Sequence, residues 1–197
     1  MCSVVLVISV IGFSGSGKTA TIEYLISRLS REGFRVGSVK HVHRAEFSID
    51  TPGKDTWRHV KAGAVVTVSV APREVAVIRK VAASGSECQL GLDGILGLLA
   101  GDGLDVVFLE GLHSLVAGRA DVPKIIAAKD LQDLKKMLDG TVPPVLAVTG
   151  PVAADRPCVR LPGGAEVPVV DLPKDGDVLL GLVKGYISGV HVSPGSG

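Results

Sequence analysis

Short apolar runs alternate with amphipathic segments along most of the chain. Residues 4–11 form an apolar run rich in β-branched side chains, which predicts a buried strand. Apolar residues then recur at Ile22, Leu25 and Leu29, along one face of a helix that we predict over residues 18–31. A buried strand followed by an amphipathic helix is the repeating unit of α/β sheets.

The alternation continues along the chain. Further strands are predicted over residues 35–39, 64–70, 74–80, 104–109, 124–128 and 142–149. Helices are predicted over residues 51–62 (with Thr51 as N-cap), 90–99, 131–138 and 175–187. Residues 151–173 are rich in proline and glycine and predict short extended pieces and turns. We therefore expect an α/β fold with a doubly wound, mostly parallel sheet flanked by helices, in one domain over residues 1–187 with a flexible tail over 188–197.

The connection between the first strand and the first helix carries a phosphate-binding motif. Residues 12–19 read Gly-Phe-Ser-Gly-Ser-Gly-Lys-Thr, a full match to G-x-x-x-x-G-K-[ST]. Glycines let successive N–H groups point at phosphate oxygens, and the helix N-terminus adds positive partial charge. Lys18, also a candidate catalytic residue, would reach the β- and γ-phosphates, and Thr19 would ligate Mg²⁺. The motif predicts a P-loop NTPase-type nucleotide site built from Gly12, Ser14, Gly15, Ser16, Gly17, Lys18, Thr19 and Ala20.

A later apolar strand ends in an acidic residue. Residues 105–111 read Asp-Val-Val-Phe-Leu-Glu-Gly, with Asp105 at the start of the strand and Glu110 at its carboxyl end. Ligands of open α/β sheets bind beyond the carboxyl ends of strands, where an acid can help to hold Mg²⁺ or orient a water. Asp105 would lie about 16 Å away along the strand. We therefore predict that Glu110 is a catalytic residue and binds the metal together with Thr19.

Charged residues and histidines gather between residues 40 and 59. On the predicted helix, Asp55, Arg58 and His59 share one face at i, i+3 and i+4. An acid, a guanidinium and an imidazole together suit contacts to phosphate or Mg²⁺, which makes Asp55 a further candidate catalytic residue. The alternative is a solvated helix face that carries an Asp–Arg pair.

Composition narrows the class of protein. Hydrophobic residues make up 46% of the chain and aromatic residues 4%, which predicts an aliphatic core. The formal net charge is +1 and no basic run occurs, which argues against nucleic acid or a membrane surface as a partner. The three cysteines are scattered and suit a reduced, cytoplasmic setting. The apolar run 4–11 is too short to span a bilayer and leads directly into the phosphate loop, so we interpret it as a strand and not as a signal peptide.

Several segments of the chain occur together in one known family. They are the phosphate loop, Val39-Lys40-His41-x-His43, Phe47-x-Ile49-Asp50-x-Pro52-Gly53-Lys54-Asp55-Thr56-x-Arg58, Ala62-Gly63-Ala64 and Glu110-Gly111. Together they resemble the MobB family of molybdopterin-guanine dinucleotide biosynthesis proteins. The segment from Asp50 to Arg58 is the most specific part, because a phosphate loop alone occurs in many unrelated families.

The resemblance implies a GTP-binding protein that uses Mg²⁺, forms a homodimer and hydrolyses GTP slowly. It implies a partner, MobA, which joins GMP from GTP to molybdopterin, and it makes molybdopterin a candidate ligand. Six residues would line the nucleotide or pterin side: Lys40, His41, Asp50, Lys54, Asp55 and Arg58. No Asn-Lys-x-Asp motif follows a late strand, so the preference for GTP over ATP rests on the resemblance alone.

Two other functions remain open from the residues. A strand that ends in Glu-Gly also resembles uridine-kinase-like enzymes, in which Asp50 or Asp55 would be the base for an acceptor hydroxyl. The pair His41-x-His43 on an extended segment, joined by His59 or His113, would instead suit a metal-delivery GTPase.

Overall fold

The computed structural model describes residues 5–44, 46–80, 90–155 and 158–189. The chain divides into two compact units: unit 1 comprises Met1–His41 and Leu92–Gly197, and unit 2 comprises Val42–Gly91. One domain over residues 1–187 therefore stays a prediction. Of the predicted tail, the structure describes only Ser188 and Gly189, which form the end of a helix and a turn.

Unit 1 is built on a mostly parallel sheet, as predicted. Within the described residues the sheet has seven strands in the order β2-β5-β1-β6-β7-β9-β8. The strands are β1 (Leu6–Ile11), β2 (Val36–Lys40), β5 (Val106–Glu110), β6 (Lys124–Ala127), β7 (Val145–Thr149), β8 (Cys158–Arg160) and β9 (Glu166–Val170). All neighbouring pairs are parallel except β8 and β9, which form an antiparallel edge.

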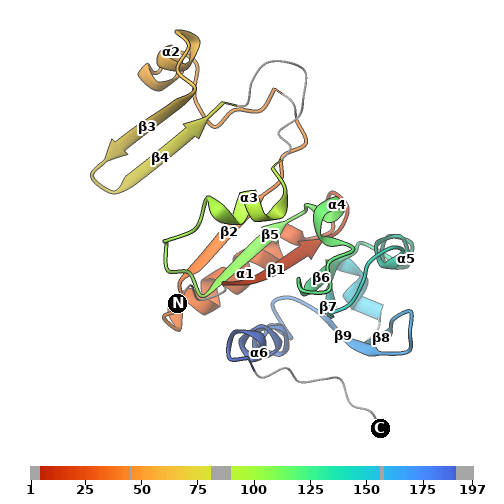
Figure 1. Cartoon of the computed structure of the whole chain (residues 1–197). Coiled ribbons are helices and arrows are strands. Elements are labelled where there is room, and N and C mark those ends of the chain that lie inside the picture. Colours follow the sequence, from red (N-terminus) through yellow and green to blue (C-terminus); the bar gives the residue numbers. More distant parts are fainter. Residues whose placement is uncertain (1–4, 45, 81–89, 156–157, 190–197) are drawn as a thin grey trace. The chain divides into compact units, whose positions relative to one another are not determined.

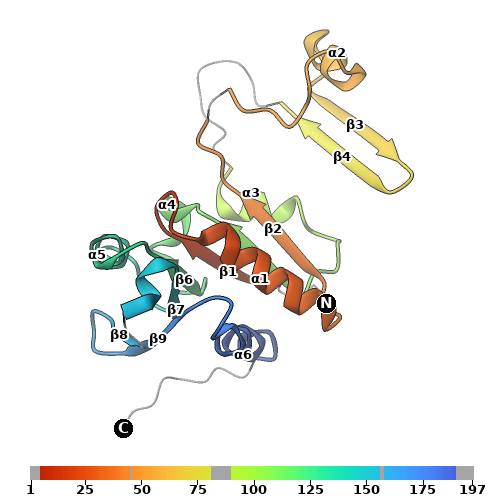
Figure 2. The same cartoon turned by 180° about the vertical axis from the view of Figure 1, so that it is seen from behind.

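Helices cover both faces of this sheet (Figures 1 and 2). On one face lie α1 (Lys18–Arg31) and α6 (Gly176–Ile187), which pack on Ile8 and Val10 of β1. On the other lie α3 (Leu92–Gly97), α4 (His113–Val116), α5 (Leu131–Leu138) and the 3₁₀ turn η1 (Pro151–Asp155), which pack with Val7 and Ile11. Successive residues of β1 thus enter two separate aliphatic clusters, which is why its apolar run has no polar interruptions except Ser9.

Several element boundaries differ from the prediction. The strand over 142–149, predicted to be broken at its entry by Pro143 and Pro144, begins at Val145, because neither proline has an N–H to donate to a ladder. The segment 151–173, predicted as extended pieces and turns, contains η1 and the β8–β9 hairpin. The short helix α4 was not predicted, because four residues give no periodicity to detect.

Unit 2 contains α2 (Asp55–Lys61) and a hairpin of β3 (Val66–Ala71) and β4 (Glu74–Arg79). The strands pair in antiparallel fashion from Val66↔Arg79 to Ala71↔Glu74, around the predicted turn at Pro72 and Arg73. The prediction that this helix has Thr51 as its N-cap was wrong, because α2 begins at Asp55 with Lys54 as N-cap. Residues 51–54 form a turn, closed by a hydrogen bond from the Lys54 N–H to the Thr51 carbonyl at 3.2 Å.

One face of the hairpin is apolar and exposed. The register places Val68 opposite Val77 and Val70 opposite Val75, so these four side chains share a face. Alternation adds a fifth valine, Val66, whose partner on this face is the exposed Arg79. All five are exposed. We call this set, Val66, Val68, Val70, Val75 and Val77, the valine face. The opposite face holds the buried Thr67.

Candidate functional site

The phosphate loop joins β1 to α1 in unit 1. Gly12 has φ +154°, and a Cβ built on it would lie 2.1 Å from the carbonyl oxygen of Ala127, so the backbone of β6 excludes any side chain there. Gly17 forms the N-cap of α1 with φ +98°. The first N–H groups of this 14-residue helix have no carbonyl partner within it and are free to bind an anion.

The loop side chains divide into exposed and buried positions. Ser14, Gly15, Thr19 and Ala20 are exposed, whereas Ser16 is fully buried beside Gly12. Among the described residues the Ser16 hydroxyl has no hydrogen-bond partner. Ser16 therefore lies on the buried side of the loop, and its exposed neighbours form the outer surface.

Lys18 folds back over the loop. Its Nζ donates a hydrogen bond to the carbonyl oxygen of Phe13 at 2.7 Å. Burial lowers the pKa of the Lys18 amino group below its usual value, while the Glu110 carboxylate acts in the opposite direction and Lys40 lowers the pKa further. The ammonium group therefore lies over the loop in a partly desolvated position, where a phosphate would relieve the cost of burying its charge.

Glu110 lies where the sequence predicted, at the carboxyl end of β5. Its Oε1 accepts hydrogen bonds from the Thr19 hydroxyl at 2.8 Å and from Lys40 Nζ at 2.8 Å. Lys40 Nζ also lies 3.5 Å from Thr19 Oγ1. The parallel register aligns Lys40 of β2 with Glu110 of β5, so two strand ends and the start of α1 meet at one edge of the sheet.

The same cluster fits a magnesium ion. Thr19 Oγ1 and Glu110 Oε1 lie 2.8 Å apart beside the phosphate loop, and both are hard oxygen donors of the type that Mg²⁺ prefers. The Glu110 side chain is only 13% exposed, so its charge requires a cationic partner. Lys40 supplies that partner in this structure, through an ion pair.

Asp105, at the other end of β5, has a different role. Its Oδ2 accepts a hydrogen bond from the Arg35 backbone N–H at 2.7 Å, and the Asp105 N–H donates to the Arg35 carbonyl at 2.8 Å. These bonds fix the start of β5 beside the start of β2. The strand therefore has a structural carboxylate at its first end and the candidate ligand at its second.

His41 is the last residue of the first of the two chain segments that form unit 1. Its backbone N–H donates to the Glu110 carbonyl at 3.1 Å, which extends the β2–β5 pairing by one residue. Among the described residues no group of three or more His, Cys, Asp or Glu side chains is arranged to hold a metal ion.

Unit 2 holds the other predicted site residues, described within that unit. Asp50 is buried, and its Oδ1 accepts a hydrogen bond from the Thr56 hydroxyl at 2.8 Å, which ties the turn to the first residues of α2. Lys54 is the extended N-cap of α2. Asp55 and Arg58 form an ion pair at 3.4 Å with side chains 85% and 71% exposed, the geometry of a solvated helix face within this unit.

The structure also reveals a residue that the sequence analysis did not select. Gly150 follows β7, and a Cβ built on it would lie 2.3 Å from the Ser16 carbonyl oxygen. The sequence shows a glycine after an apolar strand. It does not show that this glycine contacts the phosphate loop, because that contact depends on the strand order.

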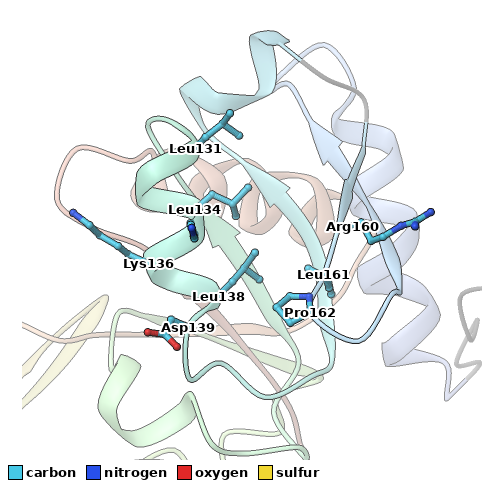
Figure 3. Close-up of a pocket in the computed structure, with 9 residues that line it drawn as sticks. Leu131, Leu134, Lys136, Leu138, Asp139, Arg160, Leu161 and Pro162 are labelled. Carbon is cyan, nitrogen blue, oxygen red and sulfur yellow. The ribbon is translucent and has the colours of Figure 1, made fainter.

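A cavity of about 870 Å³ opens between α5 and the β8–β9 turn (Figure 3). Its lining includes several leucines and both basic and acidic side chains. The lining residues are Leu131, Leu134, Lys135, Lys136, Leu138, Asp139, Arg160, Leu161 and Pro162. None of them belongs to the predicted nucleotide site.

Comparisons with known proteins agree with this architecture. Residues 7–149 match the family model MobB, molybdopterin guanine dinucleotide synthesis protein B. A relative from Haemophilus influenzae, named molybdopterin-guanine dinucleotide biosynthesis adapter protein, is 30% identical over 151 residues, which cover 76% of this chain and 78% of the relative. An Escherichia coli protein of the same name is 30% identical over 60% of this chain and 62% of its own length. A relative from Methanocaldococcus jannaschii is 30% identical over 63% of this chain and 47% of its own length.

Solved structures show the same fold. Bacillus subtilis MobB has a TM-score of 0.64 at 23% identity, over 91% of this chain and 97% of that one. A MobB homologue from Bacillus stearothermophilus has a TM-score of 0.63 at 23% identity, over 93% and 98%. With a phosphate loop, a strand-end glutamate and a family match over residues 7–149, this chain belongs to the MobB family.

Proposed function

We propose that this chain binds GTP with Mg²⁺ and acts as an adapter in the synthesis of molybdopterin guanine dinucleotide. One observation carries the nucleotide part: Thr19 and Glu110 meet at 2.8 Å beside the phosphate loop, with the Lys18 ammonium group over that loop. The choice of guanine and the pathway rest on the family and on the relatives from E. coli and H. influenzae, which carry the adapter name.

In this proposal, different residues of unit 1 bind the phosphates and the Mg²⁺ ion. The loop N–H groups and the N-terminus of α1 bind the phosphates, and Lys18 exchanges the Phe13 carbonyl for phosphate oxygens. Thr19 and Glu110 hold the Mg²⁺ ion, which would neutralise charge on the β- and γ-phosphates. Hydrolysis of GTP would be slow, as the resemblance to the MobB family implies.

The proposal includes a partner enzyme that transfers GMP to molybdopterin, as MobA does by the family resemblance. Lys54, Asp55 and Arg58 of unit 2, with exposed ionic side chains, would contact the nucleotide or the pterin. Asp50 would position this helix through Thr56. If Asp55→Ala and Arg58→Ala changed neither nucleotide binding nor partner stimulation, that part of the proposal would fail.

We also propose a homodimer formed through the valine face. A two-stranded hairpin is marginally stable alone, and five exposed valines on one face form an apolar surface that suits a self-complementary contact. A second copy supplies a matching apolar face by two-fold symmetry. Val68→Lys is expected to give monomers by light scattering, while Ser69→Lys, an exposed change on the opposite face, should leave dimers. Monomeric wild-type protein would reject this interface.

The test of the main function has two stages. Titration calorimetry should show GTP binding in the presence of Mg²⁺, and Lys18→Ala should abolish it while the circular dichroism and melting temperature are retained. The wild-type protein should then raise guanylation of molybdopterin by the partner enzyme at limiting GTP, and Lys18→Ala should not. Unchanged guanylation with added wild-type protein would reject the adapter role, even if GTP is bound.

A further inference from the structure

Lys40 forms contacts with the same two oxygens that would hold magnesium. Its Nζ lies 2.8 Å from Glu110 Oε1 and 3.5 Å from Thr19 Oγ1, and these two oxygens are 2.8 Å from each other. A divalent cation coordinated by the two oxygens would stand within a few ångströms of the Lys40 ammonium group. Two cations at that separation repel each other strongly in a partly desolvated site.

Lys40 can leave this position without disturbing the sheet. Its backbone is fixed in β2 by the register with β5, but its side chain is 56% exposed and ends a flexible four-carbon stem. Glu110 is the less mobile member, because its side chain is only 13% exposed. A cation that competes for Glu110 would therefore move Lys40 and leave the carboxylate in place.

We propose that Lys40 is a counter-ion for Glu110 that Mg²⁺ displaces when the nucleotide binds, after which the ammonium group turns to the terminal phosphate. The inference rests on the proposed nucleotide function and adds a regulatory step to it. Before Mg²⁺ arrives, Lys40 neutralises Glu110 and so allows a triphosphate to approach. Afterwards it contributes a positive charge to the phosphates. Lys40 thus lowers the dependence of nucleotide binding on Mg²⁺.

The variant Lys40→Met tests this, because it keeps the length of the side chain and removes the charge. Binding of a fluorescent GTP analogue is measured in EDTA and across a Mg²⁺ titration. Without Lys40, the unpaired Glu110 carboxylate repels the triphosphate, so affinity in EDTA should fall about two- to fivefold, the scale of a partly exposed charge pair. The Mg²⁺ concentration at half-saturation should fall by about the same factor, because the competing cation is gone.

Three comparisons make the test specific. Lys40→Arg keeps the charge and should retain wild-type affinity in EDTA. Lys136→Met, the same substitution at an exposed position on α5, should change neither quantity. In a Glu110→Gln background, the shared carboxylate is lost, so Lys40→Met should no longer lower the Mg²⁺ half-point.

The possible outcomes distinguish a failure of the proposal for Lys40 from a failure of the proposed nucleotide function. If Lys40→Met lowered the affinity equally with and without Mg²⁺ and left the Mg²⁺ concentration at half-saturation unchanged, Lys40 would only bind phosphate. That result would overturn the proposal that Lys40 and Mg²⁺ compete for Glu110. If Lys40→Met changed neither the affinity in EDTA nor the Mg²⁺ concentration at half-saturation, the proposal for Lys40 would also be overturned. Nucleotide binding by the wild-type protein would still support the proposed function. Failure of the wild-type protein to bind a GTP or ATP analogue would reject both.

Discussion

Gly150 lies directly against Ser16, although the two residues are far apart in the sequence. A Cβ built on Gly150 would lie 2.3 Å from the Ser16 carbonyl oxygen and 2.7 Å from the Ala128 carbonyl oxygen, and φ at Gly150 is +96°. A side chain at this position would have to displace backbone, and the conformation itself disfavours one. The shape of the phosphate loop therefore depends on the end of β7 as well as on the loop's own glycines.

Gly150→Ala is expected to weaken nucleotide binding by about tenfold or more, because a displaced loop loses aligned N–H groups and each 1.4 kcal/mol is tenfold in affinity. The change should be measured by calorimetry with GTP and Mg²⁺. Gly118→Ala is the matched control, because a Cβ built on Gly118 meets no atom within 4 Å. Equal affinity of the Gly150→Ala and wild-type proteins would contradict the role of this contact.

Substitutions of Glu110 and Asp105, the two carboxylates of the β5 region, should have different effects on the Mg²⁺ requirement. Glu110→Gln keeps the shape of the side chain but loses the charge beside Thr19, so we expect the Mg²⁺ requirement for nucleotide binding or hydrolysis to change more than the affinity for nucleotide. Asp105→Asn, at the other end of the strand, should leave the Mg²⁺ requirement unchanged, because Asp105 bonds to the Arg35 backbone. A shifted Mg²⁺ dependence in Asp105→Asn alone would reverse the assignment.

The sequence was sufficient to predict the parallel core of unit 1 for a physical reason. Short aliphatic runs such as 4–11, followed by a segment with a 3.6-residue apolar period, leave few alternatives to a buried strand and a covering helix. The positions of the phosphate loop and of Glu110 could be predicted, because the spacing of glycines in the loop and the carboxyl end of a strand are both local features of the sequence. The ion pair between Lys40 and Glu110 could not, because it depends on β2 pairing with β5 and not with β1.

Local hydrogen bonds account for the prediction that failed at α2. Thr51 followed by Pro52 has the sequence of a helix start, but the Asp50 carboxylate accepts from the Thr56 hydroxyl and the chain turns before entering the helix. The cap therefore became Lys54, which has no side-chain oxygen to signal it. A buried carboxylate that orders the turn competes with the N-cap pattern, and sequence alone does not show which prevails.

Lys124 provides a test of buried polar packing away from the site. It is fully buried at the start of β6, and its Nζ donates to the carbonyl oxygens of Arg119 and Val142, the latter at 2.8 Å. Lys124→Met fills the same space but leaves two carbonyls unpaired, so it should lower the free energy of unfolding by about 1–3 kcal/mol. Lys129→Met, which loses only the partly exposed pair with Asp133, should cost less than about 1 kcal/mol. Urea unfolding measures both, and equal stability of Lys124→Met and wild type would mean that these bonds contribute nothing net.

The Arg119–Asp121 pair predicts a defined acid titration. The guanidinium donates two hydrogen bonds to the carboxylate, at 2.7 and 2.6 Å. This hydrogen bonding lowers the pKa of Asp121 from 3.8 to about 2. Because the folded-state pKa lies below the unfolded value, the stabilisation by this pair is complete above the unfolded pKa and is lost as the pH falls through the folded one.

An NMR titration of the Asp121 carboxyl carbon should therefore give a midpoint near 2 in the wild-type protein. In Arg119→Met the hydrogen bonds are gone, so the midpoint should rise toward the ordinary aspartate value of 3.8. The pair is exposed to solvent, so high salt should raise the wild-type midpoint and leave that of the variant almost unchanged. A wild-type midpoint already near 3.8 would show that the two side chains do not stay paired in solution.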